Sequence, residues 1–182
     1  MTFPDAVRSV LGHYATFRGR SGRPEFWWWV LFTMLLDVAI TAVDQLTGAR
    51  IWFAIVSALV SLALLLPTLA VSVRRLHDSN LSGLWVLLPL GGTLAGGVVF
   101  FLGIGALLVG FSDNNEPTMF ELAVALWVAA GVLLVAAVVV QLVLMLRRST
   151  PGPNRFGPPP GGIALHPTRG FDGYGPGYPP TW

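Results

Sequence analysis

The residues of this sequence that could do chemistry gather in three short polar stretches. Residues 17–29 read FRGRSGRPEFWWW, residues 74–85 read RRLHDSNLSGLW, and residues 153–160 read PNRFGPPP. Arginine guanidinium groups are fork-shaped donors suited to phosphate, and nearby carboxylates supply counter-charges. The candidate binding residues are therefore Arg20, Arg23, Glu25, Arg74, Arg75, His77, Asp78, Asn80 and Arg155.

These residues suggest three different uses. They could bind the phosphate of anionic lipid headgroups, or a partner within the membrane. They could instead be structural, with arginine–carboxylate pairs and caps holding helix ends against each other. His77 and Asp78 could also act in a lipid-headgroup enzyme, although adjacent residues rarely aim at one substrate atom and no nucleophile motif accompanies them. Because this region holds one histidine and the chain has no cysteine, we expect no metal and no cofactor.

The composition indicates what kind of scaffold must position these residues. The chain has 182 residues, of which 54% are apolar and 11% are charged, and its mean hydropathy is +0.68. An average soluble domain has about 25% charged residues. These values predict a membrane protein. They exclude a soluble enzyme, a secreted disulfide scaffold and a freely soluble nucleic-acid-binding protein.

Four apolar stretches are long enough to cross a bilayer, which takes about 20 helical residues. They cover approximately residues 26–45, 51–73, 84–111 and 122–146. Ten arginines lie on one side of these spans and only Arg50 lies on the other, so we expect both termini to be cytoplasmic. Trp27, Trp28 and Trp29 predict an aromatic belt at headgroup depth. Because the connections are short, residues 25–148 are expected to form one packed four-helix transmembrane domain.

The two ends of the chain differ from the spans. Residues 1–24 have a helical period, with Val7, Val10, Leu11, Tyr14 and Phe17 on one face. This segment could lie on anionic lipid or pack against the bundle. Residues 149–182 are rich in proline and glycine, which predicts a disordered or extended cytoplasmic tail. The expected fold class is all-α: four transmembrane helices, a short N-terminal interfacial helix and a disordered C-terminal tail.

Two features inside the spans are further candidates. Asp37 is an intramembrane ionisable group that costs about 2.5 to 3.5 kcal/mol at mid-depth, so it should face the bundle and not lipid. It could hydrogen-bond across helices, or serve as the site of a small transporter or channel. Gly92 and Gly96 form a G-x-x-x-G step, which predicts close helix packing within one chain or between copies.

The three polar motifs, in this order around four spans, resemble the bacterial "domain of unknown function 805" family of small inner-membrane proteins. The resemblance covers about residues 10–160, although Leu84 stands where an aromatic residue is more usual before Trp85. It implies a multi-span protein of the bacterial cytoplasmic (inner) membrane. It supplies neither an activity nor a catalytic residue.

We therefore expect a non-enzymatic inner-membrane protein whose cytoplasmic face of arginines and tryptophans binds anionic lipid headgroups or a membrane partner. The expected partners are membrane lipids, with a membrane protein or a second copy of the chain as further candidates, and no nucleic acid. A transporter or channel using Asp37 and a lipid-headgroup enzyme using His77 and Asp78 are the alternatives.

Overall fold

The computed structural model describes residues 1–48, 50–112 and 117–160. These residues form helices α1 (Phe3–Gly12), α2 (Arg23–Thr47), α3 (Arg50–Asp78), α4 (Leu87–Ser112) and α5 (Pro117–Leu146), with a short 3₁₀ helix, η1 (Gly83–Val86), before α4. Helices α2 to α5 are long and apolar enough to cross a membrane. The predicted all-α class and its four spans are thus confirmed.

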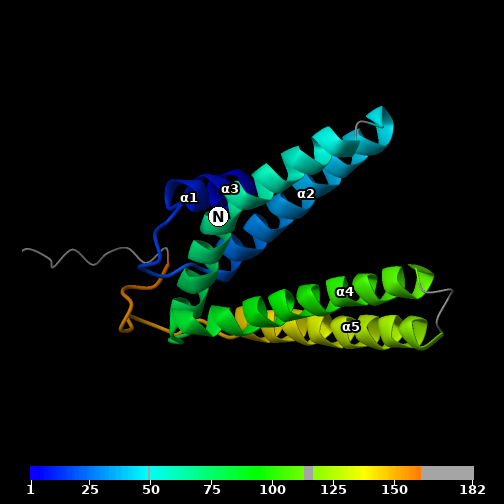
Figure 1. Cartoon of the computed structure of the whole chain (residues 1–182). Coiled ribbons are helices and arrows are strands. Elements are labelled where there is room, and N and C mark those ends of the chain that lie inside the picture. Colours follow the sequence, from blue (N-terminus) through cyan, green and yellow to red (C-terminus); the bar gives the residue numbers. More distant parts are fainter. Residues whose placement is uncertain (49, 113–116, 161–182) are drawn as a thin grey trace, which may run out of the picture.

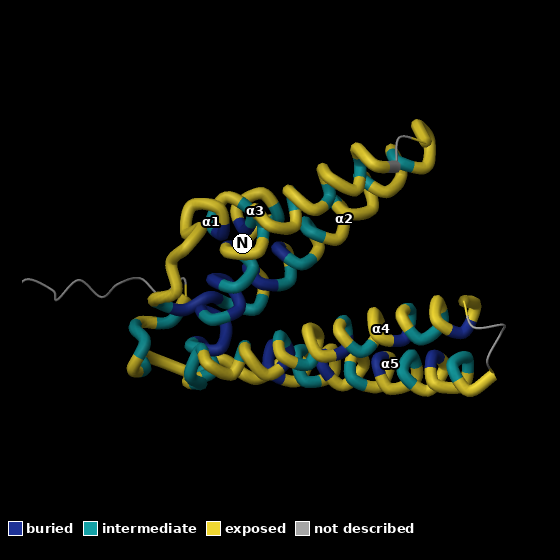
Figure 2. The backbone as a smooth tube through the Cα atoms, in the orientation of Figure 1, coloured by how far each residue is buried: buried dark blue, intermediate teal, exposed yellow. Residues whose placement is uncertain are grey.

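The four long helices form two hairpins that meet at one end only. The α2–α3 hairpin and the α4–α5 hairpin diverge away from that end, and α1 lies across the first hairpin near it (Figure 1). Buried residues concentrate there (Figure 2). We call this end the junction, defined by the buried residues Val10, Phe26, Trp29, Val71, Leu76, Leu144 and Met145.

This arrangement differs from a bundle packed along its whole length. Beyond the junction, large apolar side chains on all four long helices are exposed. Apolar side chains have no hydrophobic reason to leave lipid for one another, so helix association in a bilayer depends on close packing and polar contacts. The polar contacts between the hairpins lie at the junction, which explains why the hairpins meet there.

Helix α1 is packed against the first hairpin. Ala6 and Val10 are fully buried, whereas Leu11, Tyr14 and Phe17 of the predicted apolar face remain exposed. The helix ends before the last two of these residues, so they do not continue its periodic face. The sequence left open whether this segment lies on anionic lipid or packs against the bundle. In the structure, its helix α1 packs against the bundle.

Trp29 departs from the predicted aromatic belt. It is completely buried, and its indole N–H donates to Thr68 Oγ1 of α3 at 3.0 Å. Trp27 is half-buried and Trp28 is exposed. Because successive helical residues turn by about 100°, one of three adjacent tryptophans must face the neighbouring helix. The belt prediction is therefore wrong for Trp29.

Helix α3 continues past the predicted span end at residue 73. Arg74, Arg75, His77 and Asp78 lie within it, and the turn to η1 comprises only residues 79–82. Asn80 takes the left-handed conformation, with φ +59°, that often ends helices, and Leu81 N donates to Leu76 O at 3.0 Å. The chemistry of the second motif is therefore carried on a helix, which orients its side chains more firmly than a loop would.

Small residues let α4 and α5 approach closely along their length. The buried residues of α4 recur every seven positions, at Pro89, Gly96, Gly103 and Gly110, and those of α5 do the same at Ala123, Ala130, Ala137 and Leu144. A seven-residue period keeps one seam of each helix on its partner. A Cβ on Gly92 would lie 3.0 Å from Ala137 Cβ, and one on Gly96 would lie 2.9 Å from Leu134 Cγ. Gly92 and Gly96 thus pack within one chain.

Asp37 is not enclosed by four helices. It is exposed, and with Thr33, Ser61 and Thr68 it borders a cavity of about 230 Å³ lined by α2 and α3 alone. The sequence predicted that Asp37 faces the bundle and not lipid; the cavity that it borders lies within the first hairpin, because the two hairpins have already separated at that depth. Asp37 is the one ionisable residue lining this cavity.

The α4–α5 seam can be tested with two adjacent glycines. Gly96→Leu forces side-chain atoms against Leu134 and the Ala130 carbonyl, whereas a Cβ at Gly97 would meet open space. We expect Gly96→Leu to lower the free energy of unfolding by about 1–3 kcal/mol relative to Gly97→Leu, as overpacking does. Equilibrium unfolding in mixed detergent measures the difference. Equal stabilities of the two variants would contradict this packing.

Candidate functional site

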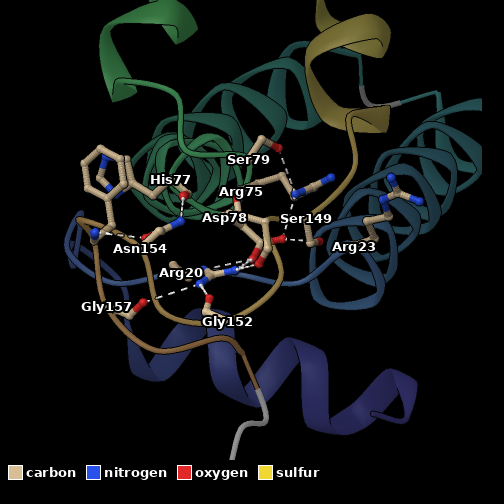
Figure 3. Close-up of polar contacts among 12 residues, drawn as sticks. Arg20, Arg23, Arg75, His77, Asp78, Ser79, Ser149, Gly152, Asn154 and Gly157 are labelled. Atoms are coloured by element: carbon tan, nitrogen blue, oxygen red, sulfur yellow. Dashed lines mark hydrogen bonds and ion pairs between the residues drawn. The ribbon is translucent and has the colours of Figure 1, made fainter. Parts of the chain in front are cut away.

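The centre of the polar cluster is the carboxylate of Asp78, at the end of α3. Its Oδ1 accepts hydrogen bonds from Arg20 Nε at 3.1 Å and Nη2 at 2.9 Å, and its Oδ2 accepts one from Arg75 Nη1 at 2.8 Å (Figure 3). The Ser149 hydroxyl also donates to Oδ2. The Arg20, Arg75 and Asp78 side chains are at most 1% exposed. The cluster thus buries one negative and two positive charges.

The second positive charge is matched by backbone carbonyls of the chain after α5. Arg20 donates to the carbonyls of Thr150 and Gly152, both at 2.7 Å. Arg75 Nε donates to Met145 O at 3.1 Å, and its Nη2 donates to Arg147 O. Carbonyls at a helix C-terminus carry partial negative charge, which suits guanidinium groups. Arg20 and Arg75 therefore fasten the end of α5 and residues 149–152 to the end of α3.

A second buried ion pair joins α1, α2 and α3. Arg74 Nη1 of α3 donates to Glu25 Oε1 at 3.3 Å. Hydroxyls complete the carboxylate's shell: Ser9 of α1 donates to Oε1 at 2.9 Å, and Ser21 donates to Oε2 at 2.7 Å. Arg74 Nε and Nη2 have no hydrogen-bond partner among the described residues. Glu25 lies in the first turn of α2, where a carboxylate also suits the helix dipole.

The third motif packs on the outer side of the cluster. The Phe156 ring stacks on His77, with centroids 3.8 Å apart and planes within 4°, and the Arg155 guanidinium lies 4.7 Å from the centre of the Phe156 ring. Asn154 Nδ2 donates to His77 O at 2.9 Å. Residues 149–160, predicted as the start of a disordered or extended tail, have an irregular backbone but pack in place. The rest of that predicted tail, 161–182, lies outside the described residues.

His77 is built into this stack and does not pair with Asp78. Its Nδ1 lies 3.2 Å from Gly19 O, and both oxygens of Asp78 are occupied by arginine and serine donors. His77 and Asp78 are therefore not arranged as a hydrogen-bonded acid–base pair. Within the described part of the chain, no group of three histidine, cysteine, aspartate or glutamate side chains could hold a metal ion.

The nine predicted site residues lie together but fall into two groups. One group takes part in buried ion pairs and consists of Arg20, Glu25, Arg74, Arg75 and Asp78. The others, at the edge of the cluster, are Arg23, His77, Asn80 and Arg155. Arg23 donates to Leu146 O at 3.0 Å and Arg147 O at 3.3 Å, and Arg155 donates to Asn80 O at 3.1 Å. The buried group corresponds to the structural alternative, in which ion pairs hold helix ends against each other.

Sequence reasoning missed the hydroxyl partners of the carboxylates. Ser9, Ser21 and Ser149 complete the shells of Glu25 and Asp78. Serines are common in polar segments, so nothing in their local sequence distinguishes them. Only the position of Ser149 directly after a span and two arginines offered a signal.

Four long apolar helices held by a buried ion-pair cluster define a polytopic α-helical integral membrane protein. The sequence profile of the family described as "Protein of unknown function (DUF805)" matches residues 14–158. The chain belongs to this family. The matched segment includes the first two motifs whole and most of the third, which confirms the resemblance drawn from them.

Relatives in Escherichia coli strain K12 match about half of the chain or less. Inner membrane protein YhaI is 39% identical over 80 residues, which cover 44% of this chain and 66% of YhaI. Inner membrane protein YhaH is 33% identical over 89 residues, covering 46% of this chain and 71% of YhaH. Uncharacterized protein YiiR is 37% identical over 73 residues, covering 40% and 48%. The chain thus spans just under two thirds of the length of YhaI. No solved structure matches the chain.

Removing the charge of Asp78 tests the cluster. Asp78→Asn leaves two buried guanidinium groups without their carboxylate, which should lower the free energy of unfolding by about 3–5 kcal/mol. Asp37→Asn is the matched control, because it removes an aspartate charge that forms no ion pair among the described residues, so it should not lower the free energy of unfolding. Denaturant titration in detergent compares the two variants with the wild type. A wild-type unfolding midpoint for Asp78→Asn would contradict the stabilising role of the cluster.

Proposed function

We propose that this protein is a non-enzymatic inner-membrane protein whose arginine-rich face, on the cytoplasmic side, holds anionic phospholipid headgroups. The observation that supports it is the set of arginines at the junction end that form no ion pair with a described carboxylate. Arg8, Arg18, Arg147, Arg148 and Arg155 are exposed, and Arg23 is half-buried. We call these six residues the open arginines.

The described carboxylates at this end do not neutralise the open arginines. Glu25 and Asp78 are buried and paired with Arg74, Arg20 and Arg75. Asp5 is exposed, and its carboxyl accepts from the backbone N–H and hydroxyl of Thr2, which lower its pKa. The face therefore presents net positive charge to whatever lies beside it. In a bacterial inner membrane the abundant partner with opposite charge is the anionic lipid headgroup.

Aromatic side chains near the open arginines support a position of this face at the depth of the lipid headgroups. Trp28 and Trp85 are exposed near the starts of α2 and α4, and Trp27 is half-buried. The Phe3 ring of α1 meets Trp28 edge to face, with centroids 5.8 Å apart. Tryptophan favours the membrane–water interface, because its ring is apolar and its N–H is polar. Basic and aromatic side chains at one level are what a headgroup layer would contact.

A charge test must leave the buried pairs intact. We choose the triple variant Arg18→Gln, Arg147→Gln and Arg148→Gln, because these side chains are exposed and glutamine keeps the carbonyl of residue 147 for Arg75. At about 1 kcal/mol per arginine, its preference for phosphatidylglycerol over phosphatidylcholine should fall on the order of a hundredfold. The measurement is native mass spectrometry of protein exposed to both lipids in detergent.

Arg50→Gln is the control variant, because that residue begins α3 at the opposite end. It should retain phosphatidylglycerol as the wild type does. The preference of the wild type for phosphatidylglycerol should also weaken as the salt concentration is raised, because salt screens the attraction between exposed charges. Unchanged selectivity in a folded triple variant would overturn the proposal. If a membrane protein co-purified with the wild type and was lost from the triple variant, a protein partner would replace lipid.

The proposed orientation can be tested with single cysteines, since the natural chain has none. Thr16→Cys places a thiol between α1 and α2, and Thr47→Cys places one at the far end of α2. Both positions are exposed. In spheroplasts, a membrane-impermeant maleimide should label Thr47→Cys only, while inside-out vesicles should reverse the result. The opposite pattern would place the open arginines outside the cytoplasm.

A further inference from the structure

An apolar pocket lies between the two hairpins next to the junction. Its volume is about 380 Å³, and its walls come from residues 26–33 of α2, 65–72 of α3, 89–93 of α4 and 137–145 of α5, with Val86 of η1. It shares Phe26, Trp29 and Met145 with the junction, and the two hairpins diverge away from that end (Figure 1). The pocket is thus formed by all four membrane helices. We call it the inter-hairpin slot.

The slot offers almost no polar contact to an occupant. Thr33, Ser72 and Thr93 each donate their hydroxyl to a carbonyl of their own helix at 2.7–2.9 Å. Thr68 accepts from the buried Trp29. Gln141 and the indole N–H of Trp27 are the remaining polar groups on the wall. An occupant would therefore be recognised by apolar contact.

One end of the slot lies beside open arginines. Arg23 precedes Phe26 and Trp27, which line the slot, by about one turn, and it donates to the carbonyls at the end of α5. Arg147 and Arg148 follow Met145, which lines the slot from α5, by two and three residues. The site therefore has positive charge at one end and apolar walls along the rest. This arrangement is complementary to an amphipathic anion.

Measured from Arg23, which lies just outside it, the slot reaches about as deep as one membrane leaflet. From Arg23 to Thr33, the deepest lining residue of α2, is ten residues, or about 15 Å of helix. The hydrocarbon core of a bilayer is about 30 Å thick, so the slot reaches about half of it. If the phosphate of a phospholipid lies at the arginines, an acyl chain of the same lipid would occupy this depth.

We propose that the inter-hairpin slot holds one acyl chain of an anionic phospholipid whose phosphate lies against Arg23, Arg147 and Arg148. This inference rests on the proposed headgroup-binding function and adds a defined chain site to it. A second copy of the protein in the slot would bring its own arginines next to these arginines, and the like charges would repel. An anionic lipid is therefore the favoured occupant. The bound chain contacts both hairpins and thereby holds them at a fixed separation.

Two variants that fill the slot test the proposal. Val138→Trp fills it from α5, and Leu90→Trp fills it from the neighbouring helix α4. The matched controls are Val139→Trp and Leu94→Trp, because those residues are exposed on the same helices and do not line the slot. Circular dichroism and gel filtration verify folding, and either slot variant alone suffices if the other misfolds.

The measurement is retention of phosphatidylglycerol by native mass spectrometry after detergent washing. We expect one retained lipid per wild-type chain, at least tenfold less in the slot variants, and wild-type retention in both controls. Lysophosphatidylglycerol, which has one chain, should compete, whereas glycerol phosphate, which has none, should not. Competition by glycerol phosphate equal to that of the lysolipid would overturn the slot, because the headgroup alone would then suffice.

Comparison with Arg147→Gln/Arg148→Gln separates this inference from the proposed function. Loss of lipid from both the arginine variant and the slot variants supports both. Loss from the arginine variant alone overturns the slot and leaves headgroup binding standing. Loss from the slot variants alone contradicts the proposed function and the headgroup part of this inference. A dimer that dissociates in the slot variants without a change in lipid retention would identify a second copy as the occupant and overturn the inference.

Discussion

The buried carboxylate of Asp78 is the constraint on which the rest of the structure depends. Moving an ionised carboxylate out of water costs several kcal/mol unless donors surround it. Here Arg20, Arg75 and Ser149 supply those donors. They come from the segment before α2, from α3 itself and from the segment after α5. Satisfying one charge therefore brings together parts of the chain more than a hundred residues apart.

The same cluster explains why the protein can be closed at one end and open along the rest of its length. Ion pairs and hydrogen bonds at the junction hold the hairpins together, while small residues on α4 and α5 hold those two helices at close range. Between α2–α3 and α4–α5 there is neither a polar link nor a small-residue seam beyond the junction in the described residues. The space that results is bounded by apolar walls and lies next to positive charge.

The arginines at the junction end thus fall into two groups. Arg20, Arg74 and Arg75 are buried, and their charges are largely matched by carboxylates and carbonyls. The open arginines form no ion pair with a described carboxylate and give the face its net charge. Residue type does not distinguish the groups, since Arg18, Arg20 and Arg23 lie in the same motif and only Arg20 forms a buried ion pair. The difference is whether a carboxylate is within reach, and that depends on the fold.

Several features follow from the sequence alone, because their physics is local. Apolar runs of sufficient length must be helices in a bilayer, so the four spans were predictable, and the three polar motifs identified the family. The tertiary structure decided that Trp29 faces α3, that Asp37 is exposed, and that residues 149–160 pack against α3. These outcomes depend on which helices meet and where they separate. That is set by contacts between residues far apart in the chain, such as Arg20 with Asp78, and local patterns of hydrophobicity and charge do not encode such pairings.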